Sequence, residues 1–580
     1  MGTKASPPLV PRPIDRTTVD LLVIGSGTGL ATALAANELG LDVAIAEKTL
    51  LLGGSTARSG GAFWIPANPV LSRDGASDTL ERGAEYLEAA VAGTSTRARW
   101  QPVLDHGAET VRMLGRTTKL RFRWVKGYSD YFPELPGGSA LGRSVESRPY
   151  DLRQLGTYRS SFQPEVMAAP FPMPVTGADY KWLNLIAKKP LRVMPMALMR
   201  AIQGIGGLML GREYAAGGQA LSGGMLAGVV RARIPIWTGA ELVDLVREGD
   251  VITGARLRQN GAEILVHARH GVVLAAGGFD HNMLMRREYQ SPSLVADLSL
   301  GASGNTGDAI SIAQRVGAAV SNMDQAWWFP AVAPVGDAAP QILLAERSLP
   351  GSIIVDGSGK RFINEATGYM GFGQEVLRRE REGDPVGTLW MIFDQRYRNS
   401  YLFAGQVFPR MALPKAWYEG GVAHRASGAK KLATAIGVPA DALSATLERF
   451  NAGAAAGSDS DYGRGISAYD RYYGDPTQQP NPCLRPIDAR RLYAVKIVIS
   501  DLGTCGGLSA DGTGRVLDVD KRVIPGLYAQ GNTAANVFGH VYPGAGATIG
   551  QGLIYGVAIA QAAARARRAS GTISGNAPTE

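Results

Sequence analysis

The sequence predicts an α/β protein in which a Rossmann-like nucleotide-binding domain is interrupted by an α+β domain. An apolar strand at residues 21–24 runs into a glycine-rich turn close to the start of the chain. Two later apolar strands, within 271–279 and 526–532, also end in glycines. Because strands of this kind present their ends to one nucleotide, both ends of the chain are expected to contribute to one domain, with a second unit inserted between them.

Composition fits a large globular enzyme. The chain has 580 residues, long for one core, with 45% hydrophobic and 19% charged residues. The net charge is +9, but no block of Lys and Arg is interleaved with aromatic residues, so we expect no nucleic-acid partner. The two cysteines indicate a reducing compartment, and no histidine stands in metal-ligand spacing, so no metal is expected.

The first strand and turn read DLLVIGSGTGLATALAANELGLDVAIAEK from Asp20. Its glycines permit a tight turn and let backbone N–H groups meet a pyrophosphate at a helix N-terminus. Glu47 lies 22 residues after Gly25, where a carboxylate can accept both ribose hydroxyls. Leu30 replaces the last small residue of the usual pattern. Strand, glycines, helix, second strand and terminal acid together predict a dinucleotide site.

The segment after Glu47 decides which dinucleotide is expected. It reads KTLLLGGSTARSGGAFWIP and concentrates glycine and hydroxyl residues in a stretch that suits a loop around a diphosphate and under a flat isoalloxazine ring. We therefore predict FAD, bound non-covalently. The predicted cofactor-binding residues are Gly25, Ser26, Gly27, Thr28, Gly29, Glu47, Lys48, Gly54, Ser55, Thr56, Ser59, Gly60, Gly61, Ala276, Gly277, Gly278, Asp308, Gly531, Asn532, Gly546, Thr548 and Ile549.

The placing of these segments at both ends of the chain resembles the fumarate reductase/succinate dehydrogenase flavoprotein superfamily. The resemblance implies an FAD-binding domain formed by residues 18–300 and 490–580, a catalytic substrate domain at 301–489 and a flexible tail at 1–17. Members that act on dicarboxylates use an Arg near the C-terminus. This chain has GHVYPGAGATIGQGL at that place, and a phenol suits a neutral ketone better than a carboxylate.

The run Tyr542-Pro543-Gly544-Ala545-Gly546 looks like the Y-P-G-x-G element of 3-ketosteroid Δ1-dehydrogenases, including those that act on cholest-4-en-3-one. In that family the tyrosine hydroxyl and the glycine N–H bind the 3-keto oxygen, which assigns this role to Tyr542 and Gly546. Two donors on one oxygen stabilise an enolate.

The same resemblance covers RFINEATGYMGFGQE and SDYFPELPGG. It implies that Tyr369 removes a proton from carbon 2 of the steroid, that Tyr131 is hydrogen-bonded to Tyr369, and that carbon 1 gives hydride to FAD. Tyr128 is a neighbouring candidate for the place of Tyr131. A phenol with a pKa near 10 is a poor base at neutral pH, so the site must either lower that pKa or transfer the proton late, once the enolate is forming.

Other functions stay open at this point. One is a 3-ketosteroid Δ4-(5α)-dehydrogenase of the same fold, and another is a non-catalytic flavin carrier on a membrane. The aromatic residues of MDQAWWFP, at 323–330, suit either a flat apolar cleft or the core.

Residues 180–212 form a basic and apolar insertion without an acidic residue between Tyr180 and Arg212. This composition favours contact with a lipid surface, and its alternative is packing on the FAD-binding domain. We see no secretory signal and expect a cytoplasmic protein, peripheral on the inner membrane face. No second nucleotide fingerprint is visible, so a quinone or another oxidant is expected as electron acceptor.

Overall fold

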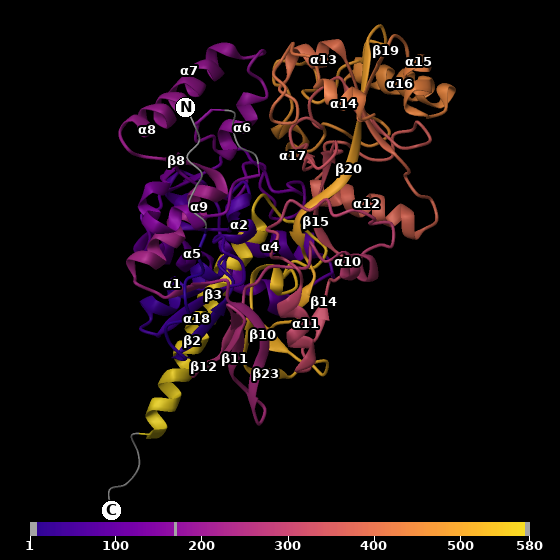
Figure 1. Cartoon of the computed structure of the whole chain (residues 1–580). Helices are drawn as coiled ribbons and strands as arrows, with labels where there is room; N and C mark the ends of the chain where they lie inside the picture. The colour runs from indigo at the N-terminus through magenta and orange to yellow at the C-terminus, as the bar shows by residue number, and fades with distance from the viewer. Residues whose placement is uncertain (1–8, 167–170, 575–580) are drawn as a thin grey trace, which may run out of the picture.

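The computed structural model describes residues 9–166 and 171–574. Its first layer is a six-stranded sheet in the order β22-β23-β13-β2-β3-β9 (Figure 1). The bounds of these strands are β2 Leu21–Ile24, β3 Val43–Glu47, β9 Ile236–Thr238, β13 Val272–Leu274, β22 Arg515–Leu517 and β23 Val523–Ala529. All pairs are parallel except β22 with β23. Strands from both ends of the chain therefore share one sheet, as the sequence predicts.

Both faces of this sheet are covered, which explains why β2 is apolar at every position. Leu21 and Val23 join a core with the helices α1 (Gly29–Glu38), α5 (Arg97–Thr117), α9 (Gly217–Arg231) and α18 (Ala547–Ser574). Leu22 and Ile24 face the other way, onto a second core. That core includes the four-stranded sheet β1-β12-β11-β10, formed by β1 Thr18–Val19, β10 Glu241–Glu248, β11 Val251–Gln259 and β12 Ala262–Ala268.

The middle of the chain builds a separate sheet in the order β16-β15-β20-β18-β17, with β19 also paired to β20. The strands are β15 Ala326–Val332, β16 Gln341–Ile342, β17 Ser352–Val355, β18 Leu389–Asp394, β19 Ala423–Ala426 and β20 Leu492–Thr504. The helix α12 (Tyr369–Arg381) contacts β15. The predicted fold class, an FAD-type Rossmann-like domain interrupted by an α+β domain, is confirmed.

Two elements cross the predicted domain boundaries at 300 and 490. The helix α11 (Asp308–Arg315) buries Ile310 and Ala313 in the core between the first two sheets. The long strand β20 pairs with β15 and β18, so residues 492–504 belong to the middle sheet. An apolar stretch does not reveal which sheet its backbone will join, and the division into domains at 300 and 490 stays a prediction.

Two helical segments bear on membrane contact. Residues 547–568 of α18 are long and apolar enough to span a bilayer, but 83% of that stretch is buried, as in the core helix of a globular protein. The basic insertion forms α6 (Gly177–Leu183), α7 (Pro190–Ala201), the π-helical turn η2 (Ile202–Gly206) and α8 (Gly207–Met209). These elements lie at the upper left of Figure 1.

Candidate active site

One cavity of about 860 Å³ runs from the turn between β2 and α1, at the six-stranded sheet, to a group of tyrosines near β15 of the middle sheet. Its size is that of a site for sizeable ligands, for which about 300–1,000 Å³ is usual. Among the predicted residues, 20 of the 22 for the cofactor line it, as do Tyr369 and Tyr542. Gly29, Gly61 and Tyr131 do not line the cavity.

The two exceptions among the glycines have a packing role. A Cβ at Gly29 would lie 2.8 Å from Cγ1 of Val23, so this glycine lets α1 approach β2. A Cβ at Gly61 would lie 2.0 Å from the carbonyl carbon of Gly217. Both glycines therefore serve the packing of the backbone behind the cavity wall and do not line the cavity.

The nucleotide end of the cavity is a polar turn around Glu47. The Glu47 carboxylate accepts hydrogen bonds from the Ser26 amide and hydroxyl, at 3.1 and 2.7 Å, and from the Thr49 amide at 3.0 Å. Gly25 has φ +108°, and a Cβ there would meet the Ala275 carbonyl at 2.2 Å. The turn therefore requires glycine and delivers the carboxylate to the cavity wall.

The residues present fit a bound dinucleotide. Gly27 and Gly60 line the cavity, and a Cβ on Gly60 would meet nothing within 4 Å. Gly27 and Thr28 bring the start of α1 to the cavity wall, and the first turn of this helix contains no acidic side chain. Free N–H groups and the helix dipole there favour a pyrophosphate.

Lys48 and Asp308 come together at the cavity wall. Nζ of Lys48 donates to Oδ2 of Asp308 at 2.5 Å and to Oγ1 of Thr306 at 2.7 Å. This pair joins the end of β3 to the start of α11, although 260 residues separate the two in the chain. A direct contact of either side chain with the cofactor stays a prediction.

Three tyrosines from distant parts of the chain meet at the other end of the cavity. The ring centroids of Tyr131 and Tyr369 are 5.4 Å apart, those of Tyr131 and Tyr542 are 5.2 Å apart, and those of Tyr369 and Tyr542 are 5.4 Å apart. Tyr369 is the first residue of α12, and Tyr542 precedes α18. The sequence prediction brought together three residues that do lie in contact.

The Y-P-G-A-G loop is held by its own carbonyl groups. The Pro543 carbonyl accepts hydrogen bonds from the Tyr131 amide at 3.0 Å and from the Tyr86 hydroxyl at 2.6 Å. Gly546 has φ +88°, and a Cβ there would meet the Ala62 carbonyl at 2.0 Å. Only glycine fits at 546, so its amide points at Tyr542 and donates to the phenolic oxygen at 3.1 Å.

Tyr131 and Tyr542 are buried and Tyr369 is half-buried, and the loss of solvation is the main cause of their raised pKa values. The pKa of Tyr131 and of Tyr369 is well above the usual value, and neighbouring phenols raise each further. The pKa of Tyr542 is also raised by burial, while the nearby Tyr369 side chain and the hydrogen bond from the Gly546 amide oppose this rise. The structure itself thus favours neutral phenols that can donate hydrogen bonds.

The predicted hydrogen bond between Tyr131 and Tyr369 stays a prediction: the proximity of the Tyr131 hydroxyl lowers the pKa of Tyr369, but no bond of ordinary geometry joins the two side chains. The Tyr131 hydroxyl is buried without a hydrogen-bond partner among the described residues. The two rings meet edge to face, at 82°, and this geometry satisfies ring contact without aligning the two hydroxyl groups.

Comparison with known proteins identifies the fold and the group. The family model described as FAD binding domain matches residues 20–549. A curated 3-oxosteroid 1-dehydrogenase of Mycolicibacterium smegmatis is 42% identical over 548 residues, covering 93% of this chain and 95% of that protein. This chain belongs to the 3-oxosteroid 1-dehydrogenase family of FAD-binding proteins. It is an oxidoreductase with FAD as cofactor, as the sequence predicts.

Two solved structures of dehydrogenases resemble this protein in fold. A 3-ketosteroid delta1-dehydrogenase from Sterolibacterium denitrificans, in complex with 1,4-androstadiene-3,17-dione, has a TM-score of 0.89 at 34% identity and covers 95% of this chain and 100% of its own. A 3-ketosteroid-delta4-(5alpha)-dehydrogenase from Rhodococcus jostii RHA1 has a TM-score of 0.65 at 22% identity, covering 94% and 97%. The second likeness concerns the fold alone.

Several lining residues of this family member escaped sequence reasoning. They belong to segments without a motif, at 163–166, 171–177, 339–344 and 402–408. Tyr469 is also new, with its ring centroid 4.4 Å from that of Tyr131, and burial raises its pKa to about 12. Tyr128 lines the cavity beside Tyr131. Of the tryptophans whose place was open, Trp327 lines the cavity 4.9 Å from the Tyr542 ring, whereas Trp328 lies in the core.

Proposed function

We propose that the chain dehydrogenates ring A of a 3-ketosteroid between carbons 1 and 2, converting a 3-oxo-4-ene steroid into the 1,4-diene. The observation that carries this proposal is the pairing of a phenol, Tyr542, with an amide, that of Gly546, at one end of the cavity. The other end of the same cavity is the glycine-rich turn that begins at Gly25. The family membership supports it.

Tyr542 and the Gly546 amide provide two hydrogen-bond donors to the 3-keto oxygen, which acidify carbon 2. The phenolate of Tyr369 takes the carbon 2 proton and becomes a neutral phenol. Bound FAD supplies the acceptor for the hydride that leaves carbon 1. The electron pair of the broken C2–H bond forms the new C1–C2 double bond, so protons and electrons balance.

The Δ4-(5α) alternative differs in the bond that is oxidised. A saturated substrate, 5α-androstane-3,17-dione, offers both positions to the same enzyme. We expect the 1-ene product from the purified holoenzyme with an artificial electron acceptor. The 4-ene as the first product would favour the alternative, and an unchanged steroid with unchanged flavin absorbance would favour the non-catalytic carrier.

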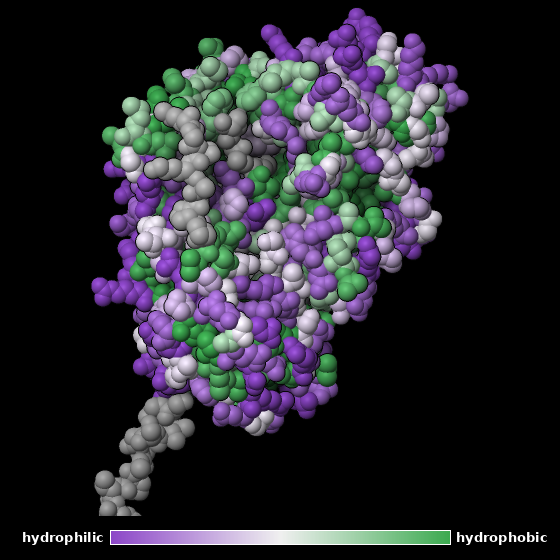
Figure 2. Space-filling view, viewed as in Figure 1, coloured by the Kyte–Doolittle hydropathy of each residue, from purple (hydrophilic) through white to green (hydrophobic). Residues whose placement is uncertain are grey.

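We also propose that the insertion docks on a lipid surface. Its side chains form an apolar face that Figure 2 shows at the upper left. The exposed members are Leu191, Met194, Leu198, Met199, Ile202, Ile205, Leu208, Met209 and Leu210. Leu191 is 94% exposed and Met209 is 83% exposed, values that a packed helical hairpin would not leave. Met194 also lines the cavity, so lipid contact would lie beside the ligand site.

Charges around this apolar face are divided. Arg192 is exposed and lies over the Trp182 ring at 3.5 Å, and Arg212 is exposed. Arg200 instead points inward and pairs with Asp179 at 2.8 Å, so it holds α6 and α7 together. Exposed arginines at the rim suit the phosphates of an anionic bilayer.

Sedimentation with anionic liposomes tests the docking. The triple variant Leu191→Asp, Leu198→Asp and Met209→Asp is expected to lose binding. The control Leu284→Asp, at a residue that is 79% exposed on α10 (Met283–Tyr289), is expected to retain it. Equal binding by both variants, or no binding by the wild type at low salt, would refute a lipid role for this face.

For the electron acceptor we propose a quinone or another small oxidant, and for the location the cytoplasm, on the inner face of the membrane. The absence of a second nucleotide fingerprint in the sequence supports the acceptor. Reduced enzyme, prepared anaerobically with a steroid, should be reoxidised by a soluble quinone analogue and not by NAD⁺. Reoxidation by NAD⁺ alone would contradict this proposal.

A further inference from the structure

Arg347 is a buried arginine that sequence reasoning did not single out. It is 1% exposed and follows β16 in the chain. Its guanidinium donates to three backbone carbonyls: Leu343 at 3.1 Å, Glu365 at 2.5 Å and Thr367 at 3.1 Å. These bonds connect the segment at 343–347, where Leu344 lines the cavity, with the segment that leads into α12.

The second segment carries Tyr369. Gly368 is the N-cap of α12 and offers no side chain to close its first turn. A Cβ at Gly368 would lie 3.2 Å from Cδ2 of Tyr131, so this backbone lies against the Tyr131 ring. By holding the Thr367 carbonyl, the guanidinium fixes the approach of Tyr369 to Tyr131.

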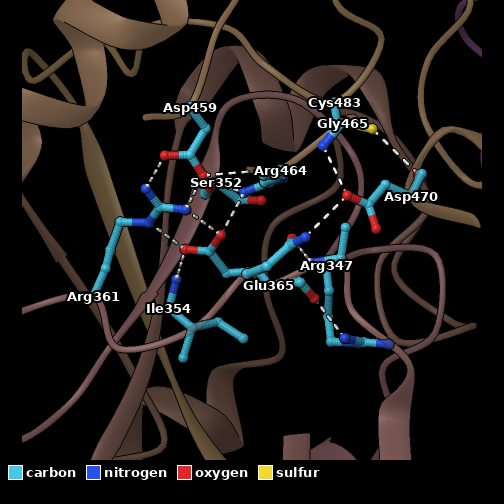
Figure 3. A network of polar contacts seen from close by, with 12 residues as sticks. Arg347, Ser352, Ile354, Arg361, Glu365, Asp459, Arg464, Gly465, Asp470 and Cys483 are labelled. Atoms are coloured by element: carbon cyan, nitrogen blue, oxygen red, sulfur yellow. Dashed lines mark hydrogen bonds and ion pairs between the residues drawn. The ribbon is translucent and has the colours of Figure 1, made fainter. Parts of the chain in front are cut away.

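The neighbouring arginines have carboxylate partners, as Figure 3 shows. Arg361 is bound to Glu365 and Asp459, at 2.7 and 2.8 Å, and Arg464 lies 3.3 Å from the Glu365 carboxylate. Arg347 contacts only the main chain of Glu365. Among the described residues its hydrogen bonds all go to carbonyl oxygens, so its charge is not neutralised by an ion pair.

The charge faces the tyrosines. The groups that interact electrostatically with Arg347 are Tyr469, Tyr131, Glu346 and Tyr128. Glu346 is turned to the amides of Leu344 and Ala404, and burial raises its pKa to about 7. Asp470 acts on Tyr469 from the same element, but its carboxylate accepts hydrogen bonds from Asn364 and the Gly465 amide. Other titratable groups around this cluster are the phenols Tyr369, Tyr472, Tyr473 and Tyr542, the Cys505 thiol and Lys181, whose Nζ lies 4.0 Å from the centroid of the Tyr472 ring.

We propose that Arg347 is a positioning residue for the ring A reaction: it fixes the turn that presents Tyr369 and supplies the positive charge that balances a phenolate in the tyrosine cluster. The proposal rests on the proposed function. The phenolate must exist before the steroid arrives, because only the deprotonated tyrosine can take the carbon 2 proton. Arg347 keeps its charge throughout and exchanges no proton.

The physical reason is that a buried cation is costly unless an anion forms beside it. Burial raises the phenol pKa values, and Arg347 opposes that rise most clearly at Tyr469. The same charge also acts on Tyr131, whose ring contacts the rings of Tyr469 and Tyr369.

Two variants test the proposal: Arg347→Gln, which removes the charge, and Arg347→Lys, which keeps it. We expect Arg347→Gln to move the rise of kcat with pH to higher pH. Each pKa increase of about one then lowers kcat at pH 7 about tenfold. Arg347→Lys should lower kcat but keep the wild-type pH profile. The control Arg287→Gln removes an exposed arginine that also binds two carbonyls, those of Leu294 and Val295, and should change neither.

A loss of kcat in Arg347→Gln that is no larger than the loss in Arg347→Lys, which keeps the charge, would overturn the electrostatic role. FAD content and thermal unfolding of each variant are measured alongside. If Arg347→Gln does not fold, Arg347→Lys decides alone. A rise of kcat that moves to higher pH in Arg347→Lys, despite the retained charge, would overturn the proposal. A wild-type enzyme that fails to form the 1,4-diene would instead refute the proposed function.

Discussion

The backbone amide of Gly546 lies 3.1 Å from the phenolic oxygen of Tyr542 and donates to it. Two donors are thus already adjacent before a ketone arrives, held by a loop in which the Pro543 carbonyl is fixed twice. A ketone oxygen that takes the place of the phenol at this amide would accept from both groups, in exchange for the bond between them.

Tyr542→Phe removes one of these donors and leaves the ring packing intact. We expect kcat to fall by about 10²–10³, as is typical for the loss of one such donor. The amide of Gly546 remains, so residual activity should persist. Stopped-flow reduction of bound FAD measures the effect, with the flavin absorbance confirming that the cofactor is retained. A change smaller than about threefold would contradict the assigned role.

The pH dependence follows from the raised pKa of Tyr369, which burial moves well above its ordinary value. A phenol with a raised pKa is almost wholly protonated at neutral pH. As long as the pH stays below that pKa, each increase of one pH unit raises the phenolate fraction about tenfold. We therefore expect kcat to increase with pH up to about pH 10 without reaching a plateau. A plateau near pH 7 would mean that another group is the base.

Tyr131→Phe separates stability from activity. The Tyr131 hydroxyl is buried without a partner among the described residues, and an unsatisfied buried polar group costs about 1–3 kcal/mol. Removing it should leave the free energy of unfolding unchanged or raise it by about 1 kcal/mol. Activity should nevertheless decrease, because the family resemblance assigns to this hydroxyl the role of assisting Tyr369 during turnover. Denaturant unfolding and kcat are measured on the same preparation; lower stability with full activity would reverse this account.

Glu346 makes stability depend on pH. Burial raises its folded-state pKa to about 7, above its ordinary value, so the folded protein binds the proton more tightly than the unfolded chain. The stability that comes from binding this proton is fully present below the pKa of Glu346 in the unfolded chain. It is lost as the pH rises through about 7, the pKa in the folded protein. Glu346→Gln should thus stabilise the protein at pH 8, on the order of 1–3 kcal/mol, and have little effect at pH 5. Thermal unfolding at both pH values checks this, and equal shifts at both would contradict it.

The parts that could be predicted from the sequence are those encoded locally. The turn from Gly25 to Gly29 and the Y-P-G-A-G loop each carry their own backbone requirement, so they point to a site without knowledge of the fold. The pairing of Tyr131 with Tyr369 came from the family resemblance. The two rings are in contact, and the hydrogen bond between their hydroxyl groups stays a prediction.

What the sequence could not provide depends on long-range packing. Arg347 reaches the carbonyls of Glu365 and Thr367 only because the middle sheet folds, and no pattern around residue 347 announces a buried cation. The strand β20 lies beside a cofactor motif in the chain but pairs with β15 and β18. The walls at 339–344 and 402–408 likewise have no local signature.

The central claim is that one cavity brings ring A of a ketosteroid to both the flavin and the tyrosines. Anaerobic mixing of the holoenzyme with androst-4-ene-3,17-dione tests it most directly, with wild type and Tyr369→Phe at equal FAD content. We predict that the wild type bleaches its flavin and forms one 1,4-diene for each flavin reduced, while Tyr369→Phe does so far more slowly. Flavin that stays oxidised in the wild type, or bleaching at an equal rate in both, would contradict the account.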